Sequence, residues 1–242
     1  MEFREVGFEY EEGKAALRGI SFTAMPGETI ALVGPTGAGK STIINLLGRF
    51  FEAGEGQILI DDEDIRQMDK RALRSQLGIV LQDAHLFAGT IRENIRYGRL
   101  DASDAEVESA AMQANAHSFI LKLPAGYNTV LTSEGSNISH GQRQLITIAR
   151  AILSDPALLI LDEATSSVDT LAELHIQDAM GKLLKGRTSF IIAHRLSTIR
   201  GADLILYIKD GEIAERGTHE ELMRRQGLYY QLQANQFADE VL

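Results

Sequence analysis

One short run near the start of the chain has the residue types and spacing of a phosphate-binding loop. Residues 34–41 read Gly-Pro-Thr-Gly-Ala-Gly-Lys-Ser and fit the pattern G-x-x-x-x-G-K-[ST] without a mismatch. The run follows an apolar segment, 29–33, and precedes a segment of helical period, 42–47, which is the context that the pattern requires. Glycines let such a loop curl so that its N–H groups point inward, and the helix N-terminus adds its positive end. The predicted nucleotide contacts of this loop are Gly34, Pro35, Thr36, Gly37, Ala38, Gly39, Lys40, Ser41 and Thr42.

Two side chains of the loop would do chemistry on a nucleotide. Lys40 would place a positive charge on the β- and γ-phosphates, and the Ser41 hydroxyl can ligate Mg²⁺. The alternative is a glycine-rich turn between a strand and a helix, with an incidental lysine. The flanking strand and helix favour the nucleotide site.

A second pair of residues supplies carboxylates. The apolar run 158–161 is followed at once by Asp162 and Glu163. Open α/β sheets bind ligands at the carboxyl ends of their strands, so we expect this pair beside the phosphate loop. Asp162 would hold Mg²⁺ directly or through water, and Glu163 would orient or deprotonate the attacking water. The plainer alternative is two acidic residues that end a buried strand.

The elements that must position these residues follow from hydrophobic patterning. Residues 2–9 and 18–24 alternate apolar and polar, as half-buried antiparallel strands do. Compact apolar runs alternate with segments of helical period, which predicts a mainly parallel α/β sheet. The runs are 29–33, 78–81, 157–161 and 189–193, and the helical segments include 104–116 and 142–153. We expect one α/β domain over residues 1–242, with an antiparallel N-terminal β subdomain, a helical insert at about 84–153, a hairpin at 203–216 and a helical segment at 218–236.

Composition excludes several classes of protein. The chain has 242 residues, 44% hydrophobic and 24% charged, which are ordinary globular values. Its net charge of −10 makes it a poor candidate for a nucleic-acid binder. It has no cysteine, so disulfides and thiolate metal sites are excluded. No segment approaches the roughly 18 apolar residues that would span a bilayer.

A third stretch gives these motifs a family context. Residues 137–144, Asn-Ile-Ser-His-Gly-Gln-Arg-Gln, are similar to the L-S-G-G-Q signature, followed by R-Q, of the ATP-binding-cassette (ABC) family. Together with the loop at 34–41 and the acidic pair, they resemble the nucleotide-binding domain of an ABC transporter, over residues 2–236. The resemblance implies a P-loop NTPase fold of the ABC cassette type, ATPase activity, and ATP and Mg²⁺ as cofactors.

The resemblance also implies roles for single residues. Tyr10 matches the aromatic residue that stacks on adenine, and Gln82 matches the loop glutamine that joins the Mg²⁺ site to the membrane-facing surface. His194 matches the histidine that contacts the γ-phosphate, and residues 166–169 match a loop that contacts the second domain. The expected catalytic residues are therefore Glu163, His194 and Lys40, and the expected metal ligands are Ser41, Gln82 and Asp162.

In this family two such domains pack head to tail around ATP. The resemblance implies that Ser139, Gly141 and Gln142 contact the nucleotide held by the other domain. Binding of ATP would close the dimer, and hydrolysis would reopen it. The partners implied are ATP, a second nucleotide-binding domain and a transmembrane domain, which places the chain at the cytoplasmic face of a membrane.

Several stretches favour an exporter. Residues 86–95, 162–169, 194–199 and 217–222 are similar to the exporter branch of the family, in which a membrane domain usually precedes the cassette on the same chain. We therefore expect the motor domain of an exporter, excised from a longer chain. The alternatives are the ATP-binding subunit of an importer and a regulatory cassette that holds ATP with little turnover. DNA-repair ATPases of the superfamily are disfavoured, because no sustained heptads separate the loop from the signature.

One position departs from the family pattern. His140 stands where the signature has glycine, while Ser139 and Gly141 are kept. An imidazole there adds bulk close to the phosphate that the signature contacts. This combination resembles the half of a heterodimeric exporter that has the good catalytic glutamate and an altered signature, and a homodimer that tolerates the histidine is the alternative. A smaller departure is Glu134, which is offset by about one residue from the glutamate of the exporter loop.

Overall fold

The structure of the chain is a computed structural model. It describes residues 1–81, 84–132, 135, 137–162, 170–193 and 196–240. Three residues with predicted roles, Gln82, Glu163 and His194, lie outside the described residues, as do residues 166–169 and Glu134. The chain divides into two compact units, residues 1–77 with 188–242 and residues 78–187. Each unit is described by itself.

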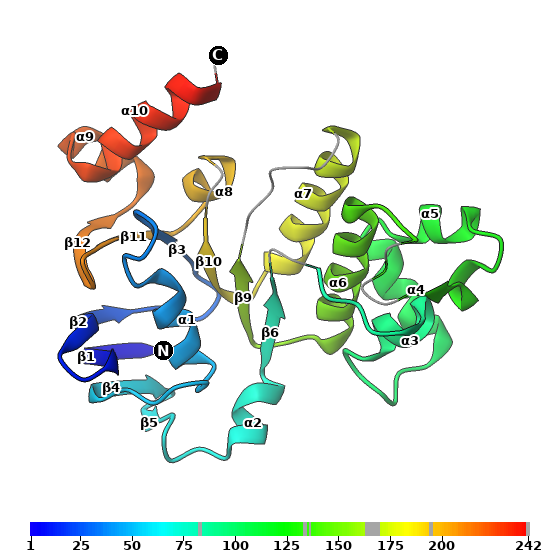
Figure 1. Ribbon diagram of the computed structural model, residues 1–242, viewed down its shortest axis with the longest axis horizontal. Coiled ribbons are helices and arrows are strands. Elements are labelled where there is room, and N and C mark those ends of the chain that lie inside the picture. The colour runs from blue at the N-terminus through cyan, green and yellow to red at the C-terminus, as the bar shows by residue number, and fades with distance from the viewer. Residues whose placement is uncertain (82–83, 133–134, 136, 163–169, 194–195, 241–242) are drawn as a thin grey trace. The chain divides into compact units, whose positions relative to one another are not determined.

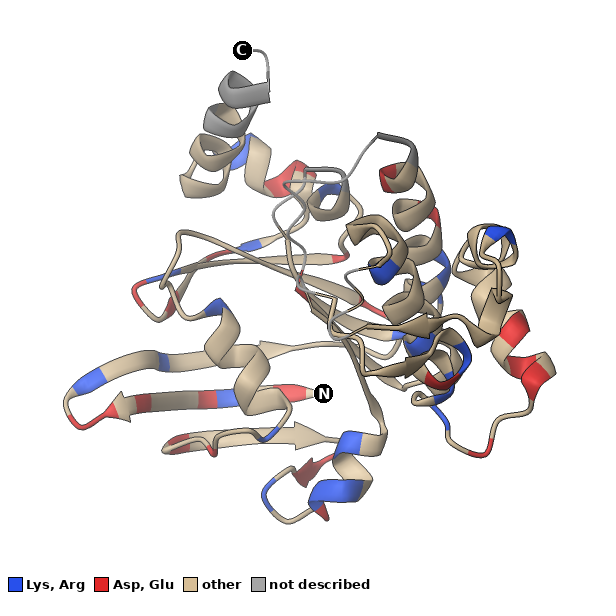
Figure 2. Ribbon diagram, turned by 45° about the vertical axis from the view of Figure 1, so that its right-hand side comes forward, with Lys and Arg blue, Asp and Glu red and all other residues tan. Residues whose placement is uncertain are grey.

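The first unit contains an antiparallel sheet in the order β2-β1-β4-β5 (Figure 1). Its strands are β1 (Glu2–Glu11), β2 (Lys14–Thr23), β4 (Glu55–Ile60) and β5 (Glu63–Asp64). Alternation in β1 and β2 buries Phe3 and Ile20 on one side. Basic and acidic residues are interspersed along the strands, as Figure 2 shows. Such a strand pattern is typical of a sheet with one face in water.

The same unit contains a group of mainly parallel strands in the order β12-β11-β3-β10. The buried strand β3 pairs in parallel with both β10 and β11, and β11 forms an antiparallel hairpin with β12. The bounds are β3 (Thr29–Val33), β10 (Thr188–Ile192), β11 (Leu204–Lys209) and β12 (Glu212–Gly217). The helices of this unit are α1 (Lys40–Leu47), α2 (Lys70–Ser75), α8 (Leu196–Arg200), α9 (His219–Arg225) and α10 (Leu228–Glu240).

The second unit combines two buried strands with a set of helices. Strand β9 lies next to β6, which begins one residue before this unit. The long helix α6 packs against α3, α4 and α7. The strands are β6 (Leu77–Val80), β7 (Gly89–Thr90), β8 (Val130–Leu131) and β9 (Leu158–Asp162). The helices are α3 (Ile91–Arg96), α4 (Asp104–Gln113), α5 (His117–Lys122), the 3₁₀ turn η1 (Gly126–Asn128), α6 (His140–Ser154) and α7 (Thr170–Leu184).

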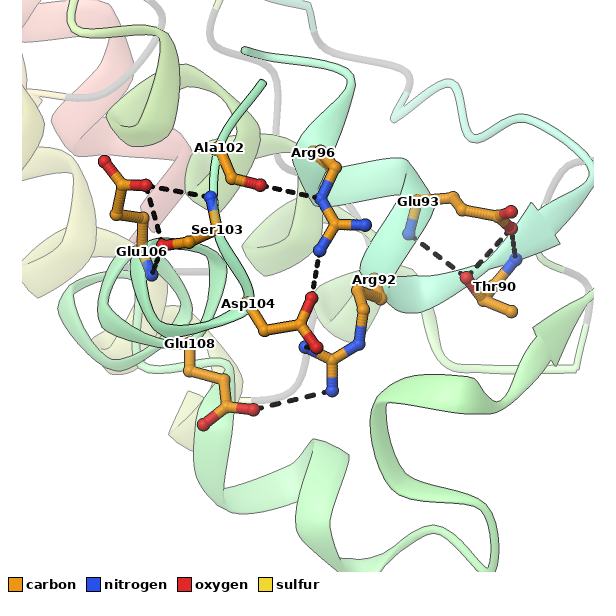
Figure 3. Close-up of polar contacts among 9 residues, drawn as sticks. All are labelled: Thr90, Arg92, Glu93, Arg96, Ala102, Ser103, Asp104, Glu106 and Glu108. Carbon is orange, nitrogen blue, oxygen red and sulfur yellow. Dashed lines mark hydrogen bonds and ion pairs between the residues drawn. The ribbon is translucent and has the colours of Figure 1, made fainter. Parts of the chain in front are cut away.

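Capping and ion pairs fix the start of two helices in this unit (Figure 3). In α3, Thr90 and Glu93 cap each other reciprocally, and in α4 Ser103 and Glu106 do the same. The guanidinium groups of Arg92 and Arg96, on α3, both reach the carboxylate of Asp104, the first residue of α4. The two ion pairs therefore join α3 to the N-terminal turn of α4.

The predicted fold class is confirmed: the chain is α/β, with a mixed and mainly parallel sheet, an antiparallel N-terminal β subdomain and a group of helices. The expected helical segment 218–236 is two helices, because Gln226 takes a left-handed conformation with φ of 51° and ends α9. Within the described ranges, no helix is long and apolar enough to cross a membrane.

Candidate nucleotide-binding site

The loop between β3 and α1 has the backbone that its glycines permit. Gly34 has φ of +136°, and a Cβ atom there would lie 2.1 Å from the carbonyl oxygen of Ile208. Gly39 caps α1 in the left-handed region, with φ of 111°. A side chain at position 34 could be accommodated only if the backbone of β11 moved. The loop is therefore held tightly against the sheet on one side.

The ammonium group of Lys40 lies inside this loop. Its Nζ donates hydrogen bonds to the carbonyl oxygens of Gly34 and Pro35, each at 2.8 Å. The residue is only 8% exposed, although lysine is rarely buried unless it is paired. Lys40 therefore extends back over the loop rather than out into solvent, where it can meet a phosphate bound there.

Helix α1 presents its positive end at the same place. Its first turn, all of which is described, contains no acidic residue, and no side chain caps it at Gly39. The N–H groups and the helix dipole therefore favour an anion at this end. Ser41 is exposed there, whereas Thr42 is buried.

Tyr10 reaches the phosphate-loop helix from β1. Its hydroxyl lies 3.2 Å from the Oγ1 atom of Thr42, and the residue is 52% exposed. Its ring meets that of Phe51 nearly at right angles, with centroids 5.2 Å apart. The structure thus brings two predicted nucleotide contacts, Tyr10 and Thr42, together within the first unit.

Asp162 is placed separately, in the second unit. It is the last residue of β9, follows four buried apolar residues and is itself partly buried. Its position at the carboxyl end of a strand is the predicted one. Glu163, the next residue, lies outside the described part of the chain.

The signature residues form the start of α6. The Oγ atom of Ser139 accepts a hydrogen bond from the N–H of Gln142 at 3.2 Å, and the Gln142 Oε1 atom accepts one from the N–H of Ser139 at 3.0 Å. Gly141 is buried within this turn. The first turn of α6, whose residues are all described, has no acidic residue, so its positive end is not neutralised from within the helix.

His140, at the first position of α6, is partly buried beside Arg143. Its Nδ1 atom lies 3.4 Å from Arg143 Nη2, while Arg143 Nη1 donates to the carbonyl oxygens of Ile138 and Gly135 at 3.0 Å and 3.3 Å. Arg143 thereby links the first turn of α6 to Gly135 and Ile138, which precede the helix. The imidazole occupies space at the edge of this turn that a glycine would leave open.

Sequence reasoning missed three of these contributors. Phe51 beside Tyr10 carries no sequence signal that would single it out, and the R-Q pair after the signature, which contains Arg143, does not reveal the contacts of Arg143 with Gly135 and Ile138. The mutual capping of Ser139 and Gln142 does have one, since S-x-x-Q before an apolar run is a capping box.

Comparison with known proteins decides the family. Residues 17–166 match the sequence profile described as ABC transporter, which is more than half of the chain. The chain belongs to the ABC transporter family.

Relatives of this ABC domain are named as transporters. It is 60% identical over 237 residues to the ABC transporter ATP-binding protein YfiC of Bacillus subtilis, covering 98% of this chain and 39% of that protein. It is 56% identical over 232 residues to the fatty acid ABC transporter ATP-binding/permease protein of Mycobacterium bovis, covering 96% of this chain and 37% of that protein. A solved structure of a bacterial Atm1-family ABC exporter with ATP bound matches with a TM-score of 0.90 and 46% identity, over 97% of this chain and 41% of that one.

The ABC domain thus spans about two fifths of the length of the relatives it matches. Its similarity to an exporter and to an ATP-binding/permease protein confirms the predicted family and exporter-type resemblance. The single site residues, by contrast, stay predictions.

Proposed function

We propose that this domain binds and hydrolyses ATP and is the motor of an ABC exporter. The observation that carries the proposal is the phosphate loop, in which the ammonium group of Lys40 lies 2.8 Å from two loop carbonyl oxygens at the uncapped positive end of α1. The high identity to exporter-type relatives supports the same function. In this proposal adenine stacks on Tyr10 and the phosphates lie on residues 34–42.

Three residues with oxygen donors would hold Mg²⁺ with the nucleotide: Ser41, Gln82 and Asp162. Hydroxyl, amide and carboxylate oxygens are the ligands that this hard cation prefers, and the exposed Ser41 hydroxyl fits that role. When bound, Mg²⁺ would neutralise part of the negative charge on the nucleotide phosphates.

Hydrolysis would proceed by attack of water on the γ-phosphorus atom. The water oxygen forms a bond to the γ-phosphorus atom while Glu163 accepts a proton from the water. The bond between the γ-phosphorus atom and the bridging oxygen of ADP breaks. Lys40 balances charge on the β- and γ-phosphates, and His194 hydrogen-bonds the γ-phosphate and keeps the water aligned. ADP and inorganic phosphate are the products.

A second domain of the same kind would complete the site. Ser139, Gly141 and Gln142 of one domain would contact the γ-phosphate bound to the other, since the first turn of α6, all of which is described, contains no acidic residue. Closure on ATP and reopening after hydrolysis would then move a transmembrane domain, at the cytoplasmic face of a membrane. The predicted insert at about 84–153 would carry this signature surface.

His140 favours an asymmetric pair of domains. Its ring takes the place of a glycine at the first turn of α6 and lies against Arg143, so a phosphate could approach this turn less closely. We propose that the domain hydrolyses ATP against a partner with an intact signature and lends its own signature to a site that mostly holds ATP. His140→Gly should then raise turnover when the domain pairs with itself and leave it nearly unchanged in the heterodimer. A large gain in the heterodimer would contradict the asymmetry.

ATP binding itself is tested with Lys40→Ala. Titration calorimetry with MgATP should show binding to the wild-type domain and a loss of at least about tenfold in affinity for Lys40→Ala, since a charge-assisted contact to phosphate is removed. Lys14→Ala, which removes an exposed lysine from β2, is the matched control and should bind normally. Equal affinity of Lys40→Ala and wild type would refute the proposed site.

A further inference from the structure

Three residues from separate segments hold the ring of Tyr10. Its hydroxyl lies 3.2 Å from Thr42 Oγ1, in the first turn of α1. Its centroid is 4.8 Å from that of Phe8 at an interplanar angle of 90°, and 5.2 Å from that of Phe51 at 85°. Perpendicular contacts at these distances are favourable for aromatic pairs. These contacts therefore restrain both the hydroxyl group and the aromatic ring of Tyr10.

These contacts leave the ring accessible. Thr42 is 6% exposed and Phe8 is buried, so the hydroxyl end and one neighbour are covered. Tyr10 itself keeps 52% of its surface exposed. A planar base can therefore reach the ring while the protein holds it in place.

Thr42 connects this ring to the phosphate loop. It follows Ser41 directly and belongs to the helix whose positive end the phosphates would meet. We propose that Thr42 and Phe51 are positioning residues for Tyr10, and that the hydrogen bond between Tyr10 and Thr42 couples recognition of the purine base to recognition of the phosphates. This inference rests on the proposed stacking of adenine on Tyr10.

The physical basis of the coupling is preorganisation. A free tyrosine ring would lose rotational freedom when a base stacks on it, and that loss weakens binding. Here the hydroxyl contact and the two perpendicular rings restrict Tyr10 before the base arrives. Because Thr42 belongs to the turn that the phosphates would contact, phosphate binding and the position of the Tyr10 ring depend on the same residue.

A double-mutant cycle tests the hydroxyl contact in the 242-residue chain. Tyr10→Phe keeps the ring and removes its hydroxyl, and Thr42→Val removes the other hydroxyl with little change of shape. Affinities for MgATP and for magnesium triphosphate, which has no base, are measured by calorimetry for wild type, both single variants and the double variant. Each single variant should weaken MgATP by about three- to tenfold, more than it weakens triphosphate, and the double variant should lose no more.

Phe51 has a matched control in the adjacent Phe50. The Cζ atom of Arg74 lies 5.0 Å from the centroid of the Phe50 ring. Phe50 is exposed to a similar degree as Phe51. Phe51→Leu should weaken MgATP several-fold without an equal loss for triphosphate. Phe50→Leu should leave both affinities at the wild-type level.

Two sets of results would overturn the inference. If the losses of affinity for MgATP add in the double variant, the two hydroxyl groups act independently. If the losses of affinity are equal for MgATP and triphosphate, the hydroxyl groups act on the phosphates alone. Tyr10→Ala separates this failure from failure of the proposed function. If Tyr10→Ala weakens MgATP but the hydroxyl variants and Phe51→Leu do not, only the positioning role is wrong. If Tyr10→Ala has no effect, stacking on Tyr10 is itself wrong.

Discussion

Ser139 and Gln142 satisfy each other's backbone N–H groups at the first turn of α6. Both residues are proposed to contact a nucleotide on a second domain, and they are also the N-cap residue and the third residue of the helix that presents them. A capping box of this kind fixes the direction in which the helix begins. Changes here should therefore affect both stability and turnover, and the two effects can be separated.

Ser139→Ala should lower the free energy of unfolding by about 1 kcal/mol, the usual cost of losing an N-cap side chain. When the domain pairs with itself, the variant should also lower ATP turnover by much more than that stability loss explains, because the Ser139 hydroxyl is also the proposed phosphate contact. Urea unfolding and phosphate release measure the two quantities.

Ser103→Ala provides the matched control for that experiment. Ser103 caps α4 through the same reciprocal pattern, with Glu106, but has no proposed contact with nucleotide. It should lose about the same stability, roughly 1 kcal/mol, and keep wild-type turnover. Equal turnover of the two variants would mean that Ser139 only caps its helix.

Two glycines of the phosphate loop, Gly34 and Gly37, should respond differently to alanine. A Cβ at Gly34 would lie 2.1 Å from the Ile208 carbonyl oxygen, whereas a Cβ at Gly37, with φ of +78°, would meet nothing within 4 Å. Gly37→Ala should cost about 1–2 kcal/mol, from left-handed strain alone. Gly34→Ala should cost clearly more, because the strain adds to a backbone clash. Denaturant unfolding without nucleotide measures both, and equal losses would contradict this account of the loop.

Parts of this site were predictable from local sequence, and parts were not. The spacing of Gly34, Gly39 and Lys40 predicts the loop because each residue type serves a backbone or charge requirement there. The contact between Tyr10 and Thr42 joins residues far apart in the sequence, and no local pattern encodes it. Only folding of β1 against α1 creates it.

The ends of the strands were likewise predictable from the sequence in some cases and not in others. The expected strand 18–24 begins earlier, at Lys14, because several register shifts between β1 and β2 break the simple alternation of apolar residues. The expected β3 and β10 agree closely with the structure, since buried parallel strands are continuous apolar runs.

The capping boxes of α3 and α4 predict a response to acid. Backbone N–H groups of Thr90 and Ser103 hydrogen-bond the carboxylates of Glu93 and Glu106 and hold the pKa of each below its usual range, with the Thr90 and Ser103 side chains adding to the effect. A carboxyl group whose pKa is lowered by folding stabilises the protein above its unfolded pKa, near 4.3, and loses that effect as pH falls through the lower folded pKa.

The double variant Glu93→Gln and Glu106→Gln should therefore show a flatter dependence of Tm on pH below about 4.3 than wild type. Both proteins should differ little in that slope near neutral pH, where the carboxylates are ionised. Scanning calorimetry at a series of pH values makes the comparison. Parallel curves throughout the acid range would show that these two caps do not contribute to acid sensitivity.

Phosphate release and MgATP-dependent elution, compared between wild type and Glu163→Gln, test the motor function most directly. Together with a partner domain that has an intact signature, wild type should release phosphate. Under the same conditions Glu163→Gln should bind MgATP with similar affinity, release phosphate at a small fraction of the wild-type rate and elute with that partner as an ATP-stabilised dimer. Phosphate release by Glu163→Gln at the wild-type rate would contradict the assignment of Glu163. The absence of phosphate release from wild type, whether alone or with a partner domain carrying an intact signature, would contradict the proposal that this domain is an ATP-hydrolysing motor.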